Sequence, residues 1–374
     1  MLRLRSQPRP EWEQRVESQG LIYHHTICWN EGAYYQFSNR EIDELEATTN
    51  ELQRLCLEAG QVMVDERSFA EFGIPESAFD AITWSWNADA PTVYGRFDLA
   101  YDGHSPPKLL EYNADTPTAL LEAAVVQWYW LQDLHPEDDQ FNSIHEHLVA
   151  KWRELGTCCA SPLYFTAAED VEAEDLMTVT YLRETAAEAG HETAALLIKD
   201  IGWVDNAREF VDLEGQAIRS IFKLYPWEWI VHEEFGAHVL ETYRDVQWIE
   251  PIWKMMWSNK ALLALLWEMF PHHPNLLPAY LDGPRNLQWY VKKPKMGREG
   301  ANLTYVGRTR LETGGDYGDE GFVFQGLAPV PVFDGNHAVI GSWVVDGEAC
   351  GIGVRESDTP VTDDVSRFVP HVFR

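Results

Sequence analysis

Two short strand-like segments joined by a turn restrict the fold of this chain more than any other feature. Residues 92–101 and 108–113 are rich in aromatic and aliphatic residues, and residues 102–107 between them contain a glycine and two prolines. Apolar segments bounded by such turn residues predict an antiparallel β-hairpin. This hairpin is the first structural element that the sequence predicts.

The polar residues of the hairpin fall at alternate positions. Because successive side chains of a strand point to opposite faces, Arg96 and Asp98 share one face, and Glu111 and Asn113 share one face of the second strand. If the two faces coincide, one surface presents an arginine, two carboxylates and an amide. Mg²⁺ prefers such oxygen ligands, and Arg96 could contact a transferred phosphoryl group. A solvated sheet face with ordinary salt bridges is the alternative that the pattern leaves open.

The remaining patterns alternate between helix and strand, which favours a mixed α/β fold. Ser38 and Glu41 have the spacing of a capping box, and Gly60 can close the helix that they begin. The pairs Asp334-Gly335 and Asp346-Gly347 are hairpin turn signals. The predicted helices are 38–60, 117–134, 144–155, 175–190 and 251–270, and the further predicted strands are 196–201, 217–224, 289–293, 322–325, 338–345 and 349–354.

The helix predicted directly after the hairpin suggests an anion site. Thr116 can cap it, and Pro117 suits its first position. Free backbone N–H groups at a helix start attract anions, and the hydroxyls of Thr116 and Thr118 add donors. A carboxylate substrate bound there would lie beside a metal-bound phosphate. Capping alone also explains Thr116, so this alternative stays open.

Two lysines occur where a phosphate would suit them. Ser258 can cap a helix, which places Lys260 in a first turn where the helix dipole disfavours a cation. Lys293 ends an apolar strand and leads into the glycine-containing loop 294–300, a plausible clamp for nucleotide phosphates. Arg355 ends a late strand of small residues, where it could reach an anion or form a surface salt bridge.

Bulk properties limit the class of protein. The 374 residues carry a formal net charge of −31, which argues against nucleic-acid binding and permits cationic substrates such as amines, although solubility alone also explains it. The sequence contains no run of eighteen apolar residues, so it predicts no membrane span. The five cysteines are an odd number, which fits reduced thiols in the cytoplasm. Residues 1–14 are expected to form a loose tail before one catalytic unit of residues 15–374.

Several motifs in order give the chain a family resemblance. Residues 110–118, Leu-Glu-Tyr-Asn-Ala-Asp-Thr-Pro-Thr, resemble the synthetase domain of the glutathionylspermidine synthase family. The resemblance extends from roughly residue 15 to the C-terminus. The further motifs that carry it are Gly95–Asp98, Ser258–Ala261, Phe270–Asn275, Lys293–Arg298 and Gly341–Trp343.

The resemblance implies a fold and a reaction. The family is of ATP-grasp type, so it implies an α+β (mixed α/β) fold with a pre-ATP-grasp region and ATP held between two subdomains. The acidic motifs precede the lysines here, as in a permuted version of that fold. The implied reaction uses ATP and two Mg²⁺ ions to phosphorylate the glycine carboxylate of glutathione. An amine or polyamine then attacks the acyl phosphate, and an amide forms.

The resemblance also assigns roles, position by position. It implies that Asp98, Glu111 and Asn113 bind Mg²⁺ and that Arg96 contacts the transferred phosphate. It places Lys260, Lys293, Gly297, Arg298, Gly300 and Gln325 around the nucleotide, with Gln325 on the adenine side. It puts Arg355 near the phosphates and the substrate carboxylate, and Thr116, Thr118, Glu174 and Asp175 on the substrate side.

Two departures from the family pattern bear on the substrates. Leu224 and Trp229 replace two threonines that line the peptide site of the family, so glutathione and spermidine both stay open as substrates. The chain has no room for the amidase domain of the bifunctional members, so we expect synthesis without hydrolysis. The sequence leaves two alternative functions open, a non-catalytic nucleotide-binding protein and a carbohydrate-active enzyme. It also permits a homo-oligomer.

Overall fold

The predicted hairpin lies inside a six-stranded antiparallel sheet. A computed structural model describes residues 1–24, 29–170, 173–298, 300–328, 330–361 and 366–374. In it, β3 (Tyr94–Ala100) pairs with β4 (Lys108–Asn113) on one side and with β17 (Asn336–Val345) on the other. The hairpin prediction is therefore confirmed. The sheet continues through β18 (Glu348–Ser357) to β19 (Arg367–Val369), and β16 (Val332–Phe333) pairs with β17.

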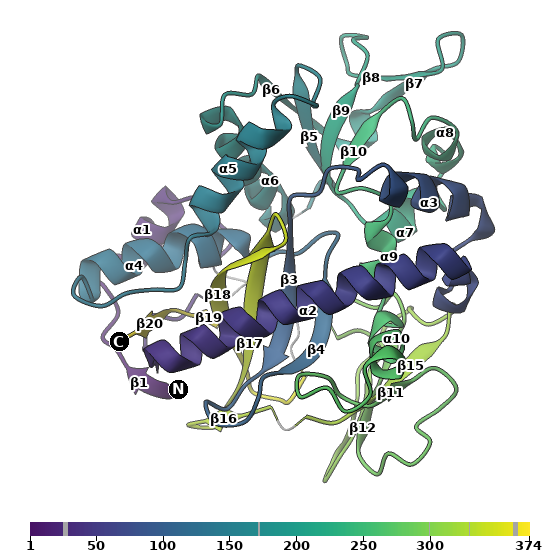
Figure 1. The fold of residues 1–374 in the computed structure, drawn as a ribbon. Helices are drawn as coiled ribbons and strands as arrows, with labels where there is room; N and C mark the ends of the chain where they lie inside the picture. Colours follow the sequence, from purple (N-terminus) through teal and green to yellow (C-terminus); the bar gives the residue numbers. More distant parts are fainter. Residues whose placement is uncertain (25–28, 171–172, 299, 329, 362–365) are drawn as a thin grey trace.

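A second sheet is parallel and covered by helices. Its order is β10 (Gln247–Ile249), β9 (Ser220–Leu224), β5 (Leu163–Ala167) and β6 (Thr193–Leu197). Strands β5 and β9 are buried throughout, as expected for parallel strands. Helices α5 (Ile144–Leu155) and α6 (Glu174–Glu188) pack beside it, and β7 (Gly202–Val204) pairs with β8 (Glu209–Val211) at its outer end (Figure 1).

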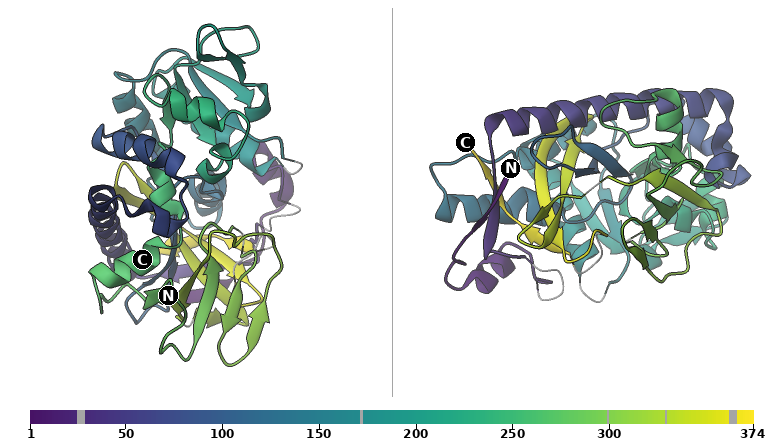
Figure 2. Two further views of the ribbon diagram at one scale, coloured as in Figure 1. Left: turned by 90° about the vertical axis from the view of Figure 1, so that its right-hand side faces the viewer. Right: turned by 90° about the horizontal axis from the view of Figure 1, so that it is seen from below.

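A third, five-stranded antiparallel sheet lies at the other end of the molecule (Figure 2). It carries Lys293 on its central strand. Its order is β11 (Ala279–Tyr280), β15 (Phe322–Gly326), β12 (Tyr290–Pro294), β13 (Thr304–Val306) and β14 (Arg310–Glu312). Lys293 and Gln325 of this sheet donate to backbone carbonyls of β4, so the sheet packs against the hairpin.

The long helix α2 (Asn39–Glu66) runs across the six-stranded sheet (Figure 1). The capping box of Ser38 and Glu41 is confirmed, since the two residues exchange side-chain to backbone hydrogen bonds. The helix does not end at Gly60 as predicted. A Cβ at Gly60 would lie 2.4 Å from the ring of Trp86, so this glycine allows close packing inside the helix.

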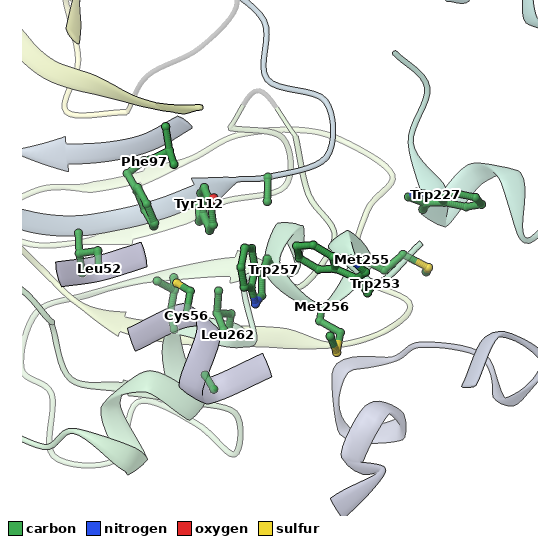
Figure 3. Packing of buried hydrophobic residues seen from close by; sticks show 14 of the residues in the cluster. Leu52, Cys56, Phe97, Tyr112, Trp227, Trp253, Met255, Met256, Trp257 and Leu262 are labelled. Carbon is green, nitrogen blue, oxygen red and sulfur yellow. The ribbon is translucent and has the colours of Figure 1, made fainter. Parts of the chain in front are cut away.

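One hydrophobic core joins α2 to the hairpin. Leu52 and Cys56 of α2 face the rings of Phe97 and Tyr112, which stack with centroids 3.8 Å apart (Figure 3). Trp257 extends the same cluster. Burial of large apolar side chains supplies about 1.5–3 kcal/mol each, so this core holds the hairpin firmly. The two polar positions on either side of Phe97 consequently share the opposite face of β3.

The helix predicted at 251–270 is two short helices. α9 (Lys254–Ser258) and α10 (Leu262–Met269) are separated at Asn259, whose backbone is extended. The Oδ1 of Asn259 accepts from the N–H of Ala261, and its Nδ2 donates to the carbonyl of Phe72. Ser258 therefore ends α9 and does not cap the following helix. Lys260 lies in the connection and not in a first turn.

The N-terminal residues are not a loose tail, which corrects the expectation for residues 1–14. β1 (Leu2–Arg5) pairs with β2 (Ala33–Phe37), which pairs with β20 (His371–Phe373). Arg3 donates to the buried carboxylate of Glu356 at 2.5 Å. The alternation of leucine and arginine in β1 fits a strand, but it spans only four residues, so its pairing with β2 and not its pattern establishes it.

The other regular elements are short. They are α1 (Trp12–Ser18), α3 (Phe79–Asn87), α4 (Gln127–Leu134), α7 (Trp227–Ile230), α8 (Gly236–Glu241), a π-helical turn at Glu122–Val126 and 3₁₀ turns at Ser68–Phe72, Glu76–Ala78 and Ile198–Asp200. Over the described ranges, no helix combines the length and apolarity needed to cross a bilayer.

Because His371 is buried, we expect its contribution to the free energy of unfolding to be lost in acid. Its ring lies fully inside the protein with one nitrogen 2.9 Å from the Oε1 of Gln127, and burial lowers its pKa to about 3. A histidine in the unfolded chain has a pKa of about 6.5, so at intermediate pH the unfolded state binds a proton that the folded state does not. The contribution is complete above the unfolded pKa and is lost as the pH falls toward the folded pKa.

We expect the free energy of unfolding, measured with urea between pH 6 and 4, to fall by about 1.4 kcal/mol per pH unit more in the wild type than in His371→Asn. Asparagine can still donate to Gln127 but does not titrate. The exposed His104→Asn variant is the matched control and should keep the wild-type slope. Equal slopes for His371→Asn and the wild type would contradict the prediction.

Candidate functional site

The register of the hairpin brings its polar residues together. Arg96 lies opposite Asn113, and Asp98 lies opposite Glu111. The Nδ2 of Asn113 is 3.3 Å from a carboxylate oxygen of Asp98 and 3.3 Å from one of Glu111. The four side chains therefore form one cluster.

Two arginines converge on Asp98. Arg96 contacts both carboxylate oxygens, at 2.7 Å through Nε and 3.2 Å through Nη2, and Arg355 reaches Oδ2 at 2.5 Å. Arg355 comes from β18, so β17 runs between it and β3. Burial opposes the charge of Arg96, but the Asp98 carboxylate outweighs it and raises the pKa of Arg96. Both arginines stay cationic beside a buried carboxylate.

A glycine makes room for this arrangement. Gly341 of β17 pairs with Asp98, and a Cβ at Gly341 would lie 2.9 Å from the Cδ of Arg96. Any side chain here would therefore push Arg96 out of its position. Sequence reading found Gly341 only as part of a motif and gave it no role in the site.

Both candidate lysines reach the same cluster. The Nζ of Lys260 lies 3.3 Å from Glu111 and donates to the carbonyl of Gly297 at 2.5 Å. Lys293 of β12 donates to the carbonyl of Leu110 at 2.9 Å. Burial, together with the neighbouring Lys260, lowers the pKa of Lys293 to about 8 although Glu111 opposes the shift.

The pKa of the Glu111 carboxyl is also lowered, but by neighbouring cations and against the effect of burial. Burial would raise its pKa, but Lys260, Lys293 and Arg355 outweigh burial and hold the pKa well below its usual range. Glu111 is therefore ionised at any ordinary pH. The cluster as a whole concentrates cations around two carboxylates within a chain whose net charge is −31.

A pocket with an empty space of about 810 Å³ opens beside this cluster. Aliphatic side chains from two sheets form one wall, and Gln325 donates from this wall to the carbonyl of Leu109 at 2.9 Å. Eight of the predicted site residues line the pocket: Asp98, Glu111, Lys260, Lys293, Gly297, Arg298, Gly300 and Gln325. The sequence did not predict the aliphatic wall, which contains Leu110, Val291, Leu303, Leu327 and Val339.

The segment after the hairpin differs from the prediction. The helix begins at Leu120, because Ala119 has a φ of 63°, so Thr116 does not cap a helix and no helix N-terminus lies at Thr118. The Oγ1 of Thr116 instead accepts from Arg298 at 2.7 Å, and the carbonyl of Thr118 accepts from Arg96. Both threonines therefore lie beside the arginines of the site, although the expected anion-binding helix start is absent there.

A buried ion pair holds this segment in place. Asp115 bonds the Nζ of Lys223 at 2.6 Å and the backbone N–H of Trp227 at 3.0 Å, and both charged side chains are inaccessible to solvent. The N–H of Asp115 donates to the Oγ of Ser258 at 2.8 Å. The sequence signal for this anchor is a lysine within the apolar strand 220–224, and the predicted site did not include it.

Glu228 is a further residue that sequence reading missed. It bonds Arg298 at 2.7 Å and so links α7 to the glycine-containing loop. Arg298 also lies over the exposed ring of Trp229, 5.7 Å from its centroid. Arg298 therefore connects the pocket to the segment where the family pattern departs.

The two acidic residues predicted on the substrate side are more peripheral. Glu174 and Asp175 form the first turn of α6, and the N–H of Asp175 donates to Asp170 at 3.1 Å. Glu174 lies near enough to Arg96 to help raise its pKa, after the larger effects of burial and Asp98. Neither residue lines the pocket described above.

Comparison with known proteins places the chain in a family. The family model described as "Glutathionylspermidine synthase preATP-grasp" matches residues 3–374. A Haemophilus influenzae protein named "Putative acid--amine ligase" is 41% identical, over 98% of this chain and 97% of that protein.

Two more distant relatives are longer than this chain. The "Trypanothione synthetase" of Crithidia fasciculata is 28% identical over 82% of this chain, and the "Bifunctional glutathionylspermidine synthetase/amidase" of Escherichia coli is 26% identical over 90%. The matched regions span 51% and 58% of those two proteins.

A solved structure confirms the mixed α/β fold. A glutathione synthetase-like effector from Globodera pallida superposes with a TM-score of 0.59 at 9% identity, covering 99% of this chain and 98% of that one. Because the family model spans almost the whole sequence and the Haemophilus influenzae relative matches end to end, the chain belongs to the glutathionylspermidine synthase preATP-grasp family.

Proposed function

We propose that this chain is an ATP-dependent ligase that joins a carboxylate to an amine through an acyl phosphate. The observation that carries the proposal is a pocket lined by two carboxylates and two lysines, with two arginines and an amide in contact with one of these carboxylates. The family relatives that are named as ligases or synthetases support it.

The donor set of the cluster fits Mg²⁺. Asp98, Glu111 and Asn113 offer hard oxygen donors, and Mg²⁺ binds few protein ligands and keeps water or phosphate for the rest. Rotation of the Asn113 amide would turn its oxygen toward the two carboxylates. Bound there, two such ions would neutralise charge on the triphosphate.

The residues of the pocket and of the cluster beside it have separate roles in the proposed reaction. Lys260 and Lys293 hold the phosphates of ATP, while the aliphatic wall accepts the base. Arg96 and Arg355 stabilise the charge on the phosphoryl group as it passes to the substrate carboxylate. The amine then attacks the acyl carbon, the new C–N bond forms, and phosphate leaves. A closed pocket excludes water, which would otherwise hydrolyse the acyl phosphate.

The substrate classes follow from charge and from the segment beside the site. A net charge of −31 favours a cationic amine or polyamine. Thr116 and Thr118 lie where a carboxylate substrate would meet Arg96 and Arg298. Trp229 adds a bulky ring at this point, so we propose an acid that differs from glutathione in the part that contacts Trp229.

The four described cysteines are free, which supports a reducing compartment such as the cytoplasm.

A screen for ADP release tests the proposed function. The full chain is incubated with Mg–ATP and pairs drawn from peptides, amino acids and polyamines. We expect ADP to appear only when a suitable acid and amine are both present, and to stop when a chelator removes Mg²⁺. ATP binding without ADP release for any pair would instead favour a non-catalytic nucleotide-binding protein.

Gly341→Ala should impair the reaction without unfolding the protein. The added methyl would displace Arg96, and misplacement of a catalytic group by about 1 Å can cost about 100-fold in rate. We therefore expect the kcat for ADP release to fall about 10- to 100-fold. The matched control is Gly314→Ala, because a Cβ there meets no atom within 4 Å. Unchanged kcat in Gly341→Ala would contradict the assignment of Arg96.

A further inference from the structure

A second cavity lies along the β10 edge of the parallel sheet. It has an empty space of about 1280 Å³ and shares no lining residue with the pocket described above. Four aromatic side chains line it: Trp84 packs against Tyr243 with ring centroids 5.4 Å apart, and Trp227 packs against Trp248 at 5.9 Å. Both pairs meet edge to face, with interplanar angles of 62° and 69°, and an aromatic lining of this kind favours an aromatic ligand.

An arginine in this cavity has no carboxylate partner. The guanidinium of Arg244 lies 5.2 Å from the ring centroid of Tyr243 and 6.0 Å from that of Trp84. Asp89 and Asp245 also line the cavity, yet within the described part of the chain no carboxylate forms an ion pair with Arg244. The stacked guanidinium keeps its N–H groups available for an anion.

Two tryptophans add apolar ring surface to the lining. The indole nitrogen of Trp248 is itself buried, and the indole N–H of Trp227 donates to the carbonyl of Glu250 at 3.0 Å. Arg244 therefore supplies the cationic contact for a ligand, while these two tryptophans contribute ring surface.

We propose that this cavity binds a flat aromatic anion, such as an aromatic carboxylate. Its ring would pack against the aromatic side chains that line the cavity, and its anionic group would meet Arg244. The cavity also touches the candidate active site through Trp227, whose N–H bonds Asp115, and the next residue, Glu228, holds Arg298. The site is separate from the nucleotide pocket and does not depend on the proposed ligase activity.

The test uses 8-anilinonaphthalene-1-sulfonate, a fluorescent aromatic anion, titrated into the full-length chain with and without saturating Mg–ATP. We expect saturable binding that Mg–ATP does not displace, and a dissociation constant raised at least about tenfold by Arg244→Gln, because a charge-assisted hydrogen bond is lost. Trp84→Leu should weaken binding as well. The matched control is Arg40→Gln, an exposed arginine on α2 with no ion pair among the described residues.

The proposal is overturned by any of three results. These are an absence of saturable binding, displacement of the probe by Mg–ATP, and equal affinity of Arg244→Gln and the wild type. Arg244 is exposed, so its substitution leaves the fold intact, and circular dichroism of each variant confirms this. The ADP-release screen decides the ligase proposal separately.

Discussion

Asp98→Asn is expected to lower the kcat for ADP release by about 1000-fold. Asp98 is the point where Arg96, Arg355 and Asn113 meet. Removing its charge leaves the buried Arg96 and the partly buried Arg355 without their anion and takes away a proposed ligand for Mg²⁺. Because both effects act where charge develops on the phosphoryl group, the loss should fall on kcat more than on the KM for ATP.

The control for this variant is Asp43→Asn, which removes a charge from an exposed position of α2. It should leave turnover unchanged. Glu111→Gln provides a second test of the metal assignment and should raise the Mg²⁺ concentration that is needed for half-maximal ADP release. Thermal unfolding of each variant separates loss of activity from loss of fold. Full turnover in Asp98→Asn would refute the assignment of the cluster.

Lys223→Met is expected to lower the free energy of unfolding by about 3–5 kcal/mol, because it leaves the carboxylate of Asp115 buried and unpaired. Both side chains of this pair are inaccessible to solvent, and their charged atoms are 2.6 Å apart. Burial raises the pKa of Asp115 and lowers that of Lys223, so each charge persists only through its partner. The measurement is urea denaturation at neutral pH.

The double variant Lys223→Met, Asp115→Asn should recover much of this loss, since replacing both charges of a buried pair can be nearly neutral. The matched control is Arg310→Met, which breaks the exposed pair with Glu312 and should cost less than about 1 kcal/mol. A Lys223→Met variant as stable as the wild type would show that the buried pair does not anchor the segment after the hairpin.

The hairpin was predictable because its signals are local. Turn residues at 102–107 and alternating polar residues such as Arg96 and Asp98 depend only on neighbours along the chain. The structure confirms the pairing of Asp98 with Glu111. The capping box at Ser38 was predictable for the same reason.

Other predictions failed where distant contacts decide the backbone. Nothing near Thr116 in sequence shows that Asp115 is held by Lys223 and Ser258, which draws the segment out of a helix until Leu120. The same holds for Lys260, because Asn259 breaks the predicted helix by bonding Phe72. Local propensity favoured helix in both places and tertiary hydrogen bonds outweighed it.

The sequence by itself determined the mixed α/β fold class, the hairpin and the chemical types of the candidate site residues, because these follow from periodicity and from motifs of a few residues. Only the tertiary structure decided that Lys260 of the α9–α10 connection and Lys293 of β12 meet Glu111, and that Glu228 holds Arg298. These contacts join residues far apart in the chain. Their geometry is set by how the three sheets pack against one another, which no local pattern encodes.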